Sequence, residues 1–287
     1  MGESLAQRAT LLFKLYLDRR QFRGPSEFSY RILRRIRGRY RLRITARDGT
    51  FRATVSLRRN TSDLATFEQT FANNSFNLRR LARWREICDL YGRIAREGTP
   101  LILDLGANVG LASLYFAKNW PRAQIIAVEP EAQNYRVTCD NLAGIPNTLP
   151  IHAGVASEDG TVRIVDPRAE AYAMRTEITA QGAPGAIPAF SVQSLLRKAV
   201  ADAIPFIVKI DIEGFERNLF SKNSDWVELF PIIIIELHDR IVPGEGVASN
   251  FLRVIAQQNR DFIVIEDNVI SIRNASSAAP ADEWRTA

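Results

Sequence analysis

Short apolar runs alternate with amphipathic helical patterns over most of the chain after residue 100. The apolar runs have the length of strands, whereas the segments between them repeat apolar residues at helical spacing. The predicted strands cover residues 101–105, 124–128, 150–155, 206–210 and 232–237, and the predicted helices cover 111–119, 132–142 and 215–220. Strands that alternate with helices in this way are typical of an α/β fold around a parallel sheet.

Three further patterns complete this region. Residues 161–165 read as an added strand, and residues 180–188 are rich in Ala, Gly and Pro, which predicts an exposed loop. Residues 262–266 and 269–272 predict a final pair of strands around Asp267-Asn268. The sheet therefore ends in a hairpin.

The first 98 residues follow a different pattern and predict a small α+β extension. Residues 5–20 form a basic amphipathic helix pattern, and residues 39–44 and 50–57 read as two strands around a turn at 47–49. Residues 61–63, Thr-Ser-Asp, supply a helix cap, and another helix is predicted over 78–96.

Composition indicates a soluble α/β protein. The chain has 287 residues, of which 46% are hydrophobic, enough for one substantial core. Its longest apolar run, 232–235 with apolar flanks, is far shorter than the ~20 residues that cross a bilayer. Lys14 interrupts the N-terminal apolar run and no small-residue cleavage site follows, so we expect a cytoplasmic protein. Cys88 and Cys139 lack metal-type spacing.

Positive charge is concentrated between Arg31 and Arg59. That segment holds eleven arginines against the single acid Asp48, while the whole chain has a formal net charge of +6. Guanidinium groups bind phosphate oxygens, so an anionic substrate, a membrane surface or a nucleic acid would each fit. The alternation over residues 39–44 equally fits a half-buried strand with its arginines in solvent.

A glycine-containing turn follows the first predicted strand of the sheet. Asp104 precedes Gly106, Asn108 and Gly110, whereas the dinucleotide fingerprint requires three glycines that admit a pyrophosphate. A carboxylate at Asp104 would repel phosphate but accept hydrogen bonds from an ammonium group. Glu129, 25 positions later at the end of the second strand, suits ribose hydroxyls. This pattern disfavours a dehydrogenase and predicts S-adenosylmethionine as the cofactor.

Acidic residues also end the later strands. In an open parallel sheet the ligand lies beyond the carboxyl ends of the strands, so these side chains should converge on one rim. They are Asp104, Glu129, Asp211 with Glu213, and Glu236 with His238. His238 shares a strand face with Glu236, which could orient it. Carboxylates of this kind are admissible Mg²⁺ ligands, although their spacing does not demand a metal.

Four motifs together resemble the FkbM-type methyltransferase family. They are Asp-Leu-Gly-Ala-Asn-Val-Gly at 104–110, Val-Glu-Pro at 128–130, Lys-Ile-Asp-Ile-Glu-Gly-Phe-Glu at 209–216 and Ile-Glu-Leu-His at 235–238. The resemblance covers residues 57 to 240. It implies a class I methyltransferase (Rossmann-like) fold, a seven-stranded, mostly parallel sheet with a reversed last strand, here with the N-terminal α+β extension. It also implies O-methylation of a hydroxyl on a sugar, glycan or polyketide-like acceptor.

The same resemblance assigns expected roles to the motif residues. The methionine part of the cofactor would contact Asp104, Gly106, Asn108 and Gly110, and the ribose would contact Glu129. The turn that contains Val155 and Ala156 would flank adenine. The acceptor would face Asp211, Glu213, Glu236 and His238. The cofactor-binding catalytic domain is then expected over 99–275, between the extension at 1–98 and a flexible tail at 276–287.

An alcohol is a poor nucleophile at neutral pH, so O-methylation needs a base near the acceptor. His238, Asp211 and Glu213 are the candidates. Two alternatives remain at this point. A nucleic-acid methyltransferase would use the arginine segment as its footprint, although residues 211–214 are not the Asn/Asp-Pro-Pro-aromatic tetrapeptide of amino-directed base methylation. A non-catalytic binding protein on the same scaffold is the other.

Overall fold

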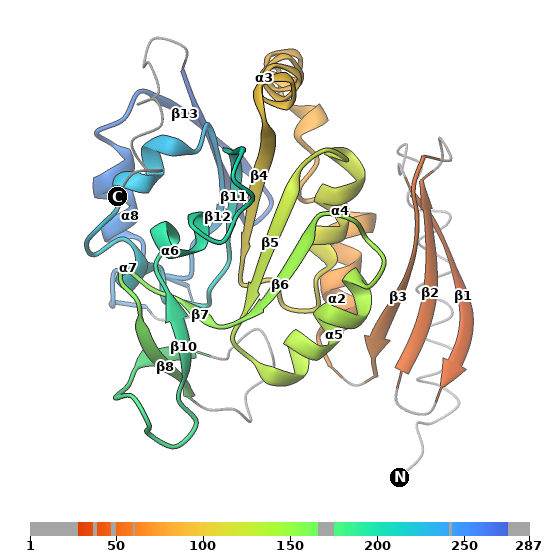
Figure 1. Cartoon of the computed structure of the whole chain (residues 1–287), viewed down its shortest axis with the longest axis horizontal. Helices are drawn as coiled ribbons and strands as arrows, with labels where there is room; N and C mark the ends of the chain where they lie inside the picture. Colours follow the sequence, from red (N-terminus) through yellow and green to blue (C-terminus); the bar gives the residue numbers. More distant parts are fainter. Residues whose placement is uncertain are drawn as a thin grey trace.

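A computed structural model describes residues 28–36, 39–46, 50–59, 61–165, 175–240 and 243–274. The predicted helix at 5–20, the turn at 47–49 and the tail at 276–287 lie outside these residues. A large central sheet dominates the structure, with a smaller sheet around β8 and β10 on one side and the strands β1, β2 and β3 on another (Figure 1).

The central sheet has seven strands in the order β13-β14-β12-β11-β4-β5-β6. Six of them run in the same direction, and β14 is antiparallel to both of its neighbours. This arrangement fits the class I methyltransferase fold and its reversed last strand. The strands are β4 (Thr99–Leu105), β5 (Gln124–Glu129), β6 (Thr148–His152), β11 (Ala203–Ile210), β12 (Ile232–Glu236), β13 (Arg260–Ile265) and β14 (Asn268–Arg273).

Both faces are buried along the central strands of this sheet, which explains the uninterrupted apolar runs in the sequence. Along β12, Ile232 and Ile234 belong to one hydrophobic core and Ile233 and Ile235 to the other. Successive side chains of a strand point to opposite faces, so a central strand such as β12 supplies both cores, whereas the edge strand β13 leaves Phe262 and Val264 exposed.

Helices cover the two faces. α3 (Trp84–Glu97), α4 (Leu111–Asn119) and α5 (Ala132–Leu142) contribute to the first core, and α6 (Val192–Leu196), α7 (Glu216–Leu219) and α8 (Ser249–Ile255) to the second. Of these, α4 and α5 have the bounds that the sequence predicts. The helix predicted over 78–96 is in fact a 3₁₀ turn, Leu78–Arg80, followed by α3.

A four-stranded accessory sheet has the order β7-β10-β8-β9. Its strands are β7 (Gly154–Val155), β8 (Gly160–Val165), β9 (Arg175–Ile178) and β10 (Ile187–Phe190). The prediction of one strand over 150–155 is therefore wrong, because the chain leaves the central sheet after His152 and β7 pairs with β10. The predicted loop at 180–188 is also too long, since β10 already begins at Ile187.

The N-terminal sheet confirms the predicted hairpin and adds a strand. β2 (Arg39–Ala46) and β3 (Arg52–Arg58) pair antiparallel, and β1 (Phe28–Ile36), which the sequence analysis did not predict, pairs with β2. Along β2, Leu42 and Ile44 are buried in the first core while Arg41 and Arg43 are exposed, so these arginines do point to solvent. Asn141 of α5 accepts a hydrogen bond from the Ser56 amide at 2.7 Å, which attaches this sheet to the helix layer.

The helix cap predicted at residues 61–63 does not form the expected side-chain hydrogen bond. Ser62 is the N-cap residue of α2 (Asp63–Phe67) but makes no side-chain capping hydrogen bond. The buried Asp63 carboxylate instead binds Arg58, accepting from its amide at 2.7 Å and from its guanidinium at 2.7 and 3.1 Å. A π-helical turn, Glu68–Ala72, then carries Phe71 into the core.

Within the described parts of the chain, every helix is too short or too polar to cross a bilayer.

Replacing Asp63 by alanine should lower the free energy of unfolding by about 3 kcal/mol, because removing one partner leaves the largely buried Arg58 guanidinium uncompensated. Urea unfolding would measure this loss. Glu158→Ala is the control, since the Glu158–Lys222 pair is exposed on both sides and should contribute about 0–1 kcal/mol. Equal losses for the two variants would contradict a structural role for the Arg58–Asp63 pair.

Candidate functional site

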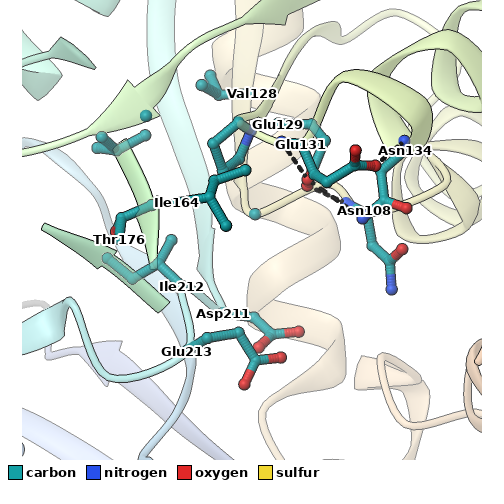
Figure 2. Close-up of a pocket in the computed structure, with 14 residues that line it drawn as sticks. Asn108, Val128, Glu129, Glu131, Asn134, Ile164, Thr176, Asp211, Ile212 and Glu213 are labelled. Atoms are coloured by element: carbon teal, nitrogen blue, oxygen red, sulfur yellow. Dashed lines mark hydrogen bonds between the residues drawn. The ribbon is translucent and has the colours of Figure 1, made fainter. Parts of the chain in front are cut away.

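Two adjoining cavities lie at the carboxyl ends of β4, β5, β11 and β12. The first is lined on one side by Asn108 and Glu129 and on the other by Ile164 and Thr176 (Figure 2). The second has a volume of about 490 Å³ and extends toward α2 and the β13–β14 turn. The residues that line both cavities are Gly106, Asn108, Asp211 and Glu213.

The turn after β4 needs glycine at its first position. Gly106 has φ +78°, and a Cβ there would lie 1.8 Å from the carbonyl oxygen of Asp211. The backbone of this turn therefore packs directly on the end of β11. Asn108 adopts φ +50°, a left-handed conformation that asparagine tolerates, and its amide donates to Glu129 at 2.8 Å.

Asp104 is fully buried and lines neither cavity. Its carboxylate accepts from the Ser113 hydroxyl at 2.6 Å and pairs with the Lys209 ammonium at 3.2 Å. Lys209 in turn donates to the Gly106 carbonyl at 2.7 Å. Burial opposes the charge of Lys209, but the Asp104 and Asp211 carboxylates outweigh it and hold the pKa of Lys209 above its ordinary value. Any effect of Asp104 on a ligand is therefore transmitted through Lys209 and the glycine turn.

Glu129 has its carboxylate at the first cavity. It accepts hydrogen bonds from the amides of Asn108 and Glu131 at 2.8 and 2.9 Å, and from the Asn134 side chain at 3.3 Å. Burial raises the pKa of Glu129 to about 7, although these donors act in the opposite direction. Glu129 is thus a carboxyl group whose charge changes near neutral pH.

The two residues predicted to flank adenine lie in different surroundings. Val155 lines the first cavity, whereas Ala156 is fully buried between β8 and β10 and its amide donates to the Phe190 carbonyl. Ile164 of β8 and Thr176 of β9 also line this cavity, and sequence reasoning missed both. They come from the accessory sheet, and no motif in the sequence indicates that this sheet lines the same cavity as Glu129.

The second cavity contains the buried imidazole of His238, which is only 1% exposed. Its Nδ1 bonds Glu216 Oε1 at 2.9 Å. Its Nε2 lies 3.5 Å from Asp211, 3.6 Å from Glu213 and 3.8 Å from Glu236. Burial opposes protonation, but the Glu216 bond and the other carboxylates prevail and raise the pKa of His238 to about 9.

The four predicted acceptor-side residues are thus close together, but Glu216 rather than Glu236 makes the short bond that orients His238. Glu216 lies within the 209–216 motif, and that position was its only signal in the sequence. Burial and the neighbouring charge of Asp211 raise the pKa of Glu213 to about 8 and also raise the pKa of Glu236. Glu213 has φ +55°, so β11 has already ended where it turns toward His238.

The remaining walls of the second cavity come from distant segments. Thr66 of α2, together with Gln69 and Asn73 from the following turn, faces the cavity. Glu266 and Asp267 from the β13–β14 turn close another side, and a hydrogen bond from the Ser75 hydroxyl to Glu266 connects these two walls. None of these residues stood out in the sequence, because single polar residues in turns look like ordinary surface positions.

The sequence is similar to a family model and to two proteins named as methyltransferases. Residues 104–264 match the sequence model of the methyltransferase FkbM domain. Hexuronic acid methyltransferase AglP of Haloferax volcanii is 23% identical over 182 residues, which cover 62% of this chain and 72% of AglP. Methyltransferase sdnD of Sordaria araneosa is 39% identical over 66 residues, which cover 22% of this chain and 26% of sdnD.

Solved structures that are similar to parts of this one include methyltransferase FkbM from Methylobacillus flagellatus, at 13% identity and a TM-score of 0.41. The similarity covers 61% of this chain and 43% of that one. A putative caffeoyl-CoA O-methyltransferase from Staphylococcus aureus is 15% identical, with a TM-score of 0.37 and coverage of 74% and 97%. The chain therefore spans only about a quarter of sdnD and less than half of the Methylobacillus protein.

Gly106→Ala should destabilise the protein by about 2–3 kcal/mol more than Gly144→Ala, as measured by thermal or urea unfolding. Both glycines have φ near +80°, so both variants share the strain of a left-handed alanine. A Cβ at Gly106 would collide with the Asp211 carbonyl oxygen, whereas nothing lies within 4 Å of a Cβ at Gly144. Similar losses for both variants would show that the turn moves freely away from β11.

Proposed function

The chain belongs to the FkbM methyltransferase family, whose members depend on S-adenosylmethionine, and from this premise we propose that it methylates a hydroxyl oxygen of a sugar, glycan or polyketide-like acceptor. The observation that carries the proposal is the pair of adjoining cavities with Gly106, Asn108, Asp211 and Glu213 on their common boundary. A methyl donor in the first cavity and a hydroxyl in the second would meet at this boundary.

The residues around the first cavity fit S-adenosylmethionine. The buried Glu129 carboxylate suits two ribose hydroxyls, and Val155, Ile164 and Ile212 supply an apolar surface for adenine. Gly106 lines this cavity, so the turn after β4 presents backbone groups to a ligand. When bound, the cofactor supplies a methyl carbon activated by a positively charged sulfur.

The second cavity fits a small acceptor with several hydroxyl groups. Its volume is within the range of small-molecule sites, and its walls carry amide, hydroxyl and carboxylate groups that can accept or donate hydrogen bonds. Relatives named as methyltransferases, one of them acting on hexuronic acid, support this class of acceptor. The abundance of carboxylates here, with Arg240 as an exposed cation at the rim, favours an uncharged polyhydroxyl acceptor over a hexuronate.

The chain must also receive the hydroxyl proton while the new carbon–oxygen bond forms. His238 is surrounded by carboxylates and bonded to Glu216, so it is poorly placed to accept another proton. Asp211 lies on the boundary of both cavities, between Lys209 and His238 at 3.5 Å from each. We therefore assign Asp211 as the proton acceptor. The protein's other contribution is to align the oxygen with the methyl group and to exclude water.

The first test is calorimetric titration with S-adenosylhomocysteine, with NAD as the control ligand. Micromolar affinity for the first and none for the second would support the cofactor assignment. Incubation with methyl-labelled S-adenosylmethionine and a panel of neutral sugars, amino sugars, hexuronic acids and hydroxylated polyketides would then identify the acceptor. Binding of NAD in place of the homocysteine derivative would overturn the proposal.

Affinity for S-adenosylhomocysteine should rise roughly tenfold from about pH 6 to about pH 8. Because burial raises the pKa of Glu129 to about 7, its carboxyl is mostly neutral at the lower pH and mostly ionised at the higher one. Only the ionised form can accept from both ribose hydroxyls. Glu129→Gln should weaken binding by about 10- to 100-fold and flatten the pH profile. A pH profile that survives this substitution would assign the dependence to another group.

Asp211→Asn should reduce turnover by about 100-fold while S-adenosylhomocysteine affinity stays within about threefold. His238→Ala should likewise affect turnover more than cofactor binding, because it removes the group around which the carboxylates gather. Asp140→Asn, an exposed residue paired with Arg39, is the matched control and should leave both quantities unchanged. Wild-type rates in the Asp211 and His238 variants would remove these residues from the mechanism.

A further inference from the structure

We propose that Asp211, Glu213 and His238 bind a divalent transition-metal ion, of the Mn²⁺ type, at the boundary of the two cavities. One ligand atom from each residue lies within 4.8 Å of the other two, and all three residues line the second cavity. The site stands on its geometry, whereas its role in the reaction rests on the proposed O-methylation.

The distances around His238 Nε2 are those of shared coordination. Nε2 lies 3.5 Å from Asp211 Oδ1 and 3.6 Å from Glu213 Oε2, whereas an N–H···O hydrogen bond measures about 2.7–3.2 Å. Two ligands that each lie about 2.1 Å from one ion are separated by about 3.0–3.5 Å. A small inward movement of these side chains would therefore complete the coordination.

The imidazole is already oriented as a ligand. The Nδ1–H of His238 donates to Glu216 Oε1 at 2.9 Å, which turns Nε2 toward Asp211, Glu213 and Glu236. Metal-bound histidines almost always donate their second N–H to a carboxylate or carbonyl in this manner. Glu216 is fully buried, and its Oε2 has no hydrogen-bond partner among the described residues. A buried carboxylate with one oxygen that lacks a hydrogen-bond donor is stabilised by a positive charge in addition to that of the imidazole.

The charge balance of the cluster also calls for a cation. Carboxylates outnumber permanent cations here, because Lys209 is shared between Asp104 and Asp211 and Arg240 is mostly exposed. Glu236 Oε1 lies 3.8 Å from Nε2 and already accepts a hydrogen bond from Arg240 at 3.2 Å, so it is left out of the ligand set. An imidazole within an otherwise carboxylate set favours Mn²⁺ over Mg²⁺, which prefers oxygen ligands and retains its waters.

An ion at this position would sit beside the acceptor hydroxyl. Coordination would make the hydroxyl more acidic, so that its proton passes to a nearby carboxylate or to water. The oxygen then forms the carbon–oxygen bond to the methyl group as the carbon–sulfur bond breaks, and that electron pair stays on the sulfur. The ion would thereby lower the demand on Asp211 as a base.

The test is titration of chelator-treated full-length protein with MnCl₂ by calorimetry, with free Mn²⁺ followed by electron paramagnetic resonance. We expect one ion per chain, with MgCl₂ binding at least about tenfold more weakly. Asp211→Asn and His238→Gln should each weaken Mn²⁺ binding by at least about tenfold. Thermal unfolding of both variants checks that they fold. If the His238 variant fails to fold, the near-isosteric Asp211→Asn variant still decides the test.

Asp267→Asn is the matched control, because Asp267 lines the same cavity but is outside the three-residue set. It should change Mn²⁺ affinity by less than about twofold. An equal loss in Asp267→Asn and Asp211→Asn would mean diffuse attraction to an acidic surface and would overturn the site, as would the absence of stoichiometric binding. S-adenosylhomocysteine is titrated into the same samples. Its binding without Mn²⁺ binding would refute the metal site alone, and Mn²⁺ binding without it would refute the proposed function alone.

Discussion

The buried ion pair between Lys209 and Asp104 holds the ends of β4 and β11 in place, and the site depends on it. Lys209 pairs with Asp104 at 3.2 Å and donates to the Gly106 carbonyl at 2.7 Å, so one ammonium connects the sheet to the glycine turn. Neither charge has ready access to water, and removal of either partner would leave the other buried without compensation. The turn that forms the common boundary of the two cavities is thus tied to the core of the sheet.

Cationic side chains placed among the carboxylates allow the fold to bring so many acidic residues to one edge of the central sheet. Parallel strands bring their carboxyl ends to the same side, which gathers Asp211, Glu213 and Glu236. His238 lies within 3.8 Å of all three acids, and Lys209 pairs with Asp211 and with the buried Asp104. Burial, followed by the neighbouring charge of Asp211, raises the pKa of Glu213 to about 8. A cavity wall with this many carboxyl groups is suited to hydroxyl donors.

The site also draws on segments outside the central sheet. The accessory sheet brings Ile164 and Thr176 over the first cavity, and α2 brings Thr66 to the second. α2 is held in turn by the Arg58–Asp63 pair, which connects it to the N-terminal sheet. Residues near the N-terminal sheet therefore take part in shaping the second cavity.

The sequence by itself determined the central sheet, α4, α5 and the strand-end acids. A run of consecutive apolar residues such as 232–235 avoids water only if both faces of its strand are buried. The carboxyl ends of parallel strands lie at the same edge of the sheet, so acids that end these strands come close together. Only the tertiary structure decided that Asp104 turns into the core, that Glu216 orients His238, and that β7 leaves the sheet after His152. Those outcomes depend on contacts between residues that lie far apart in the chain. The partner of a buried polar residue cannot be identified from the sequence, because the fold decides which polar groups meet away from water.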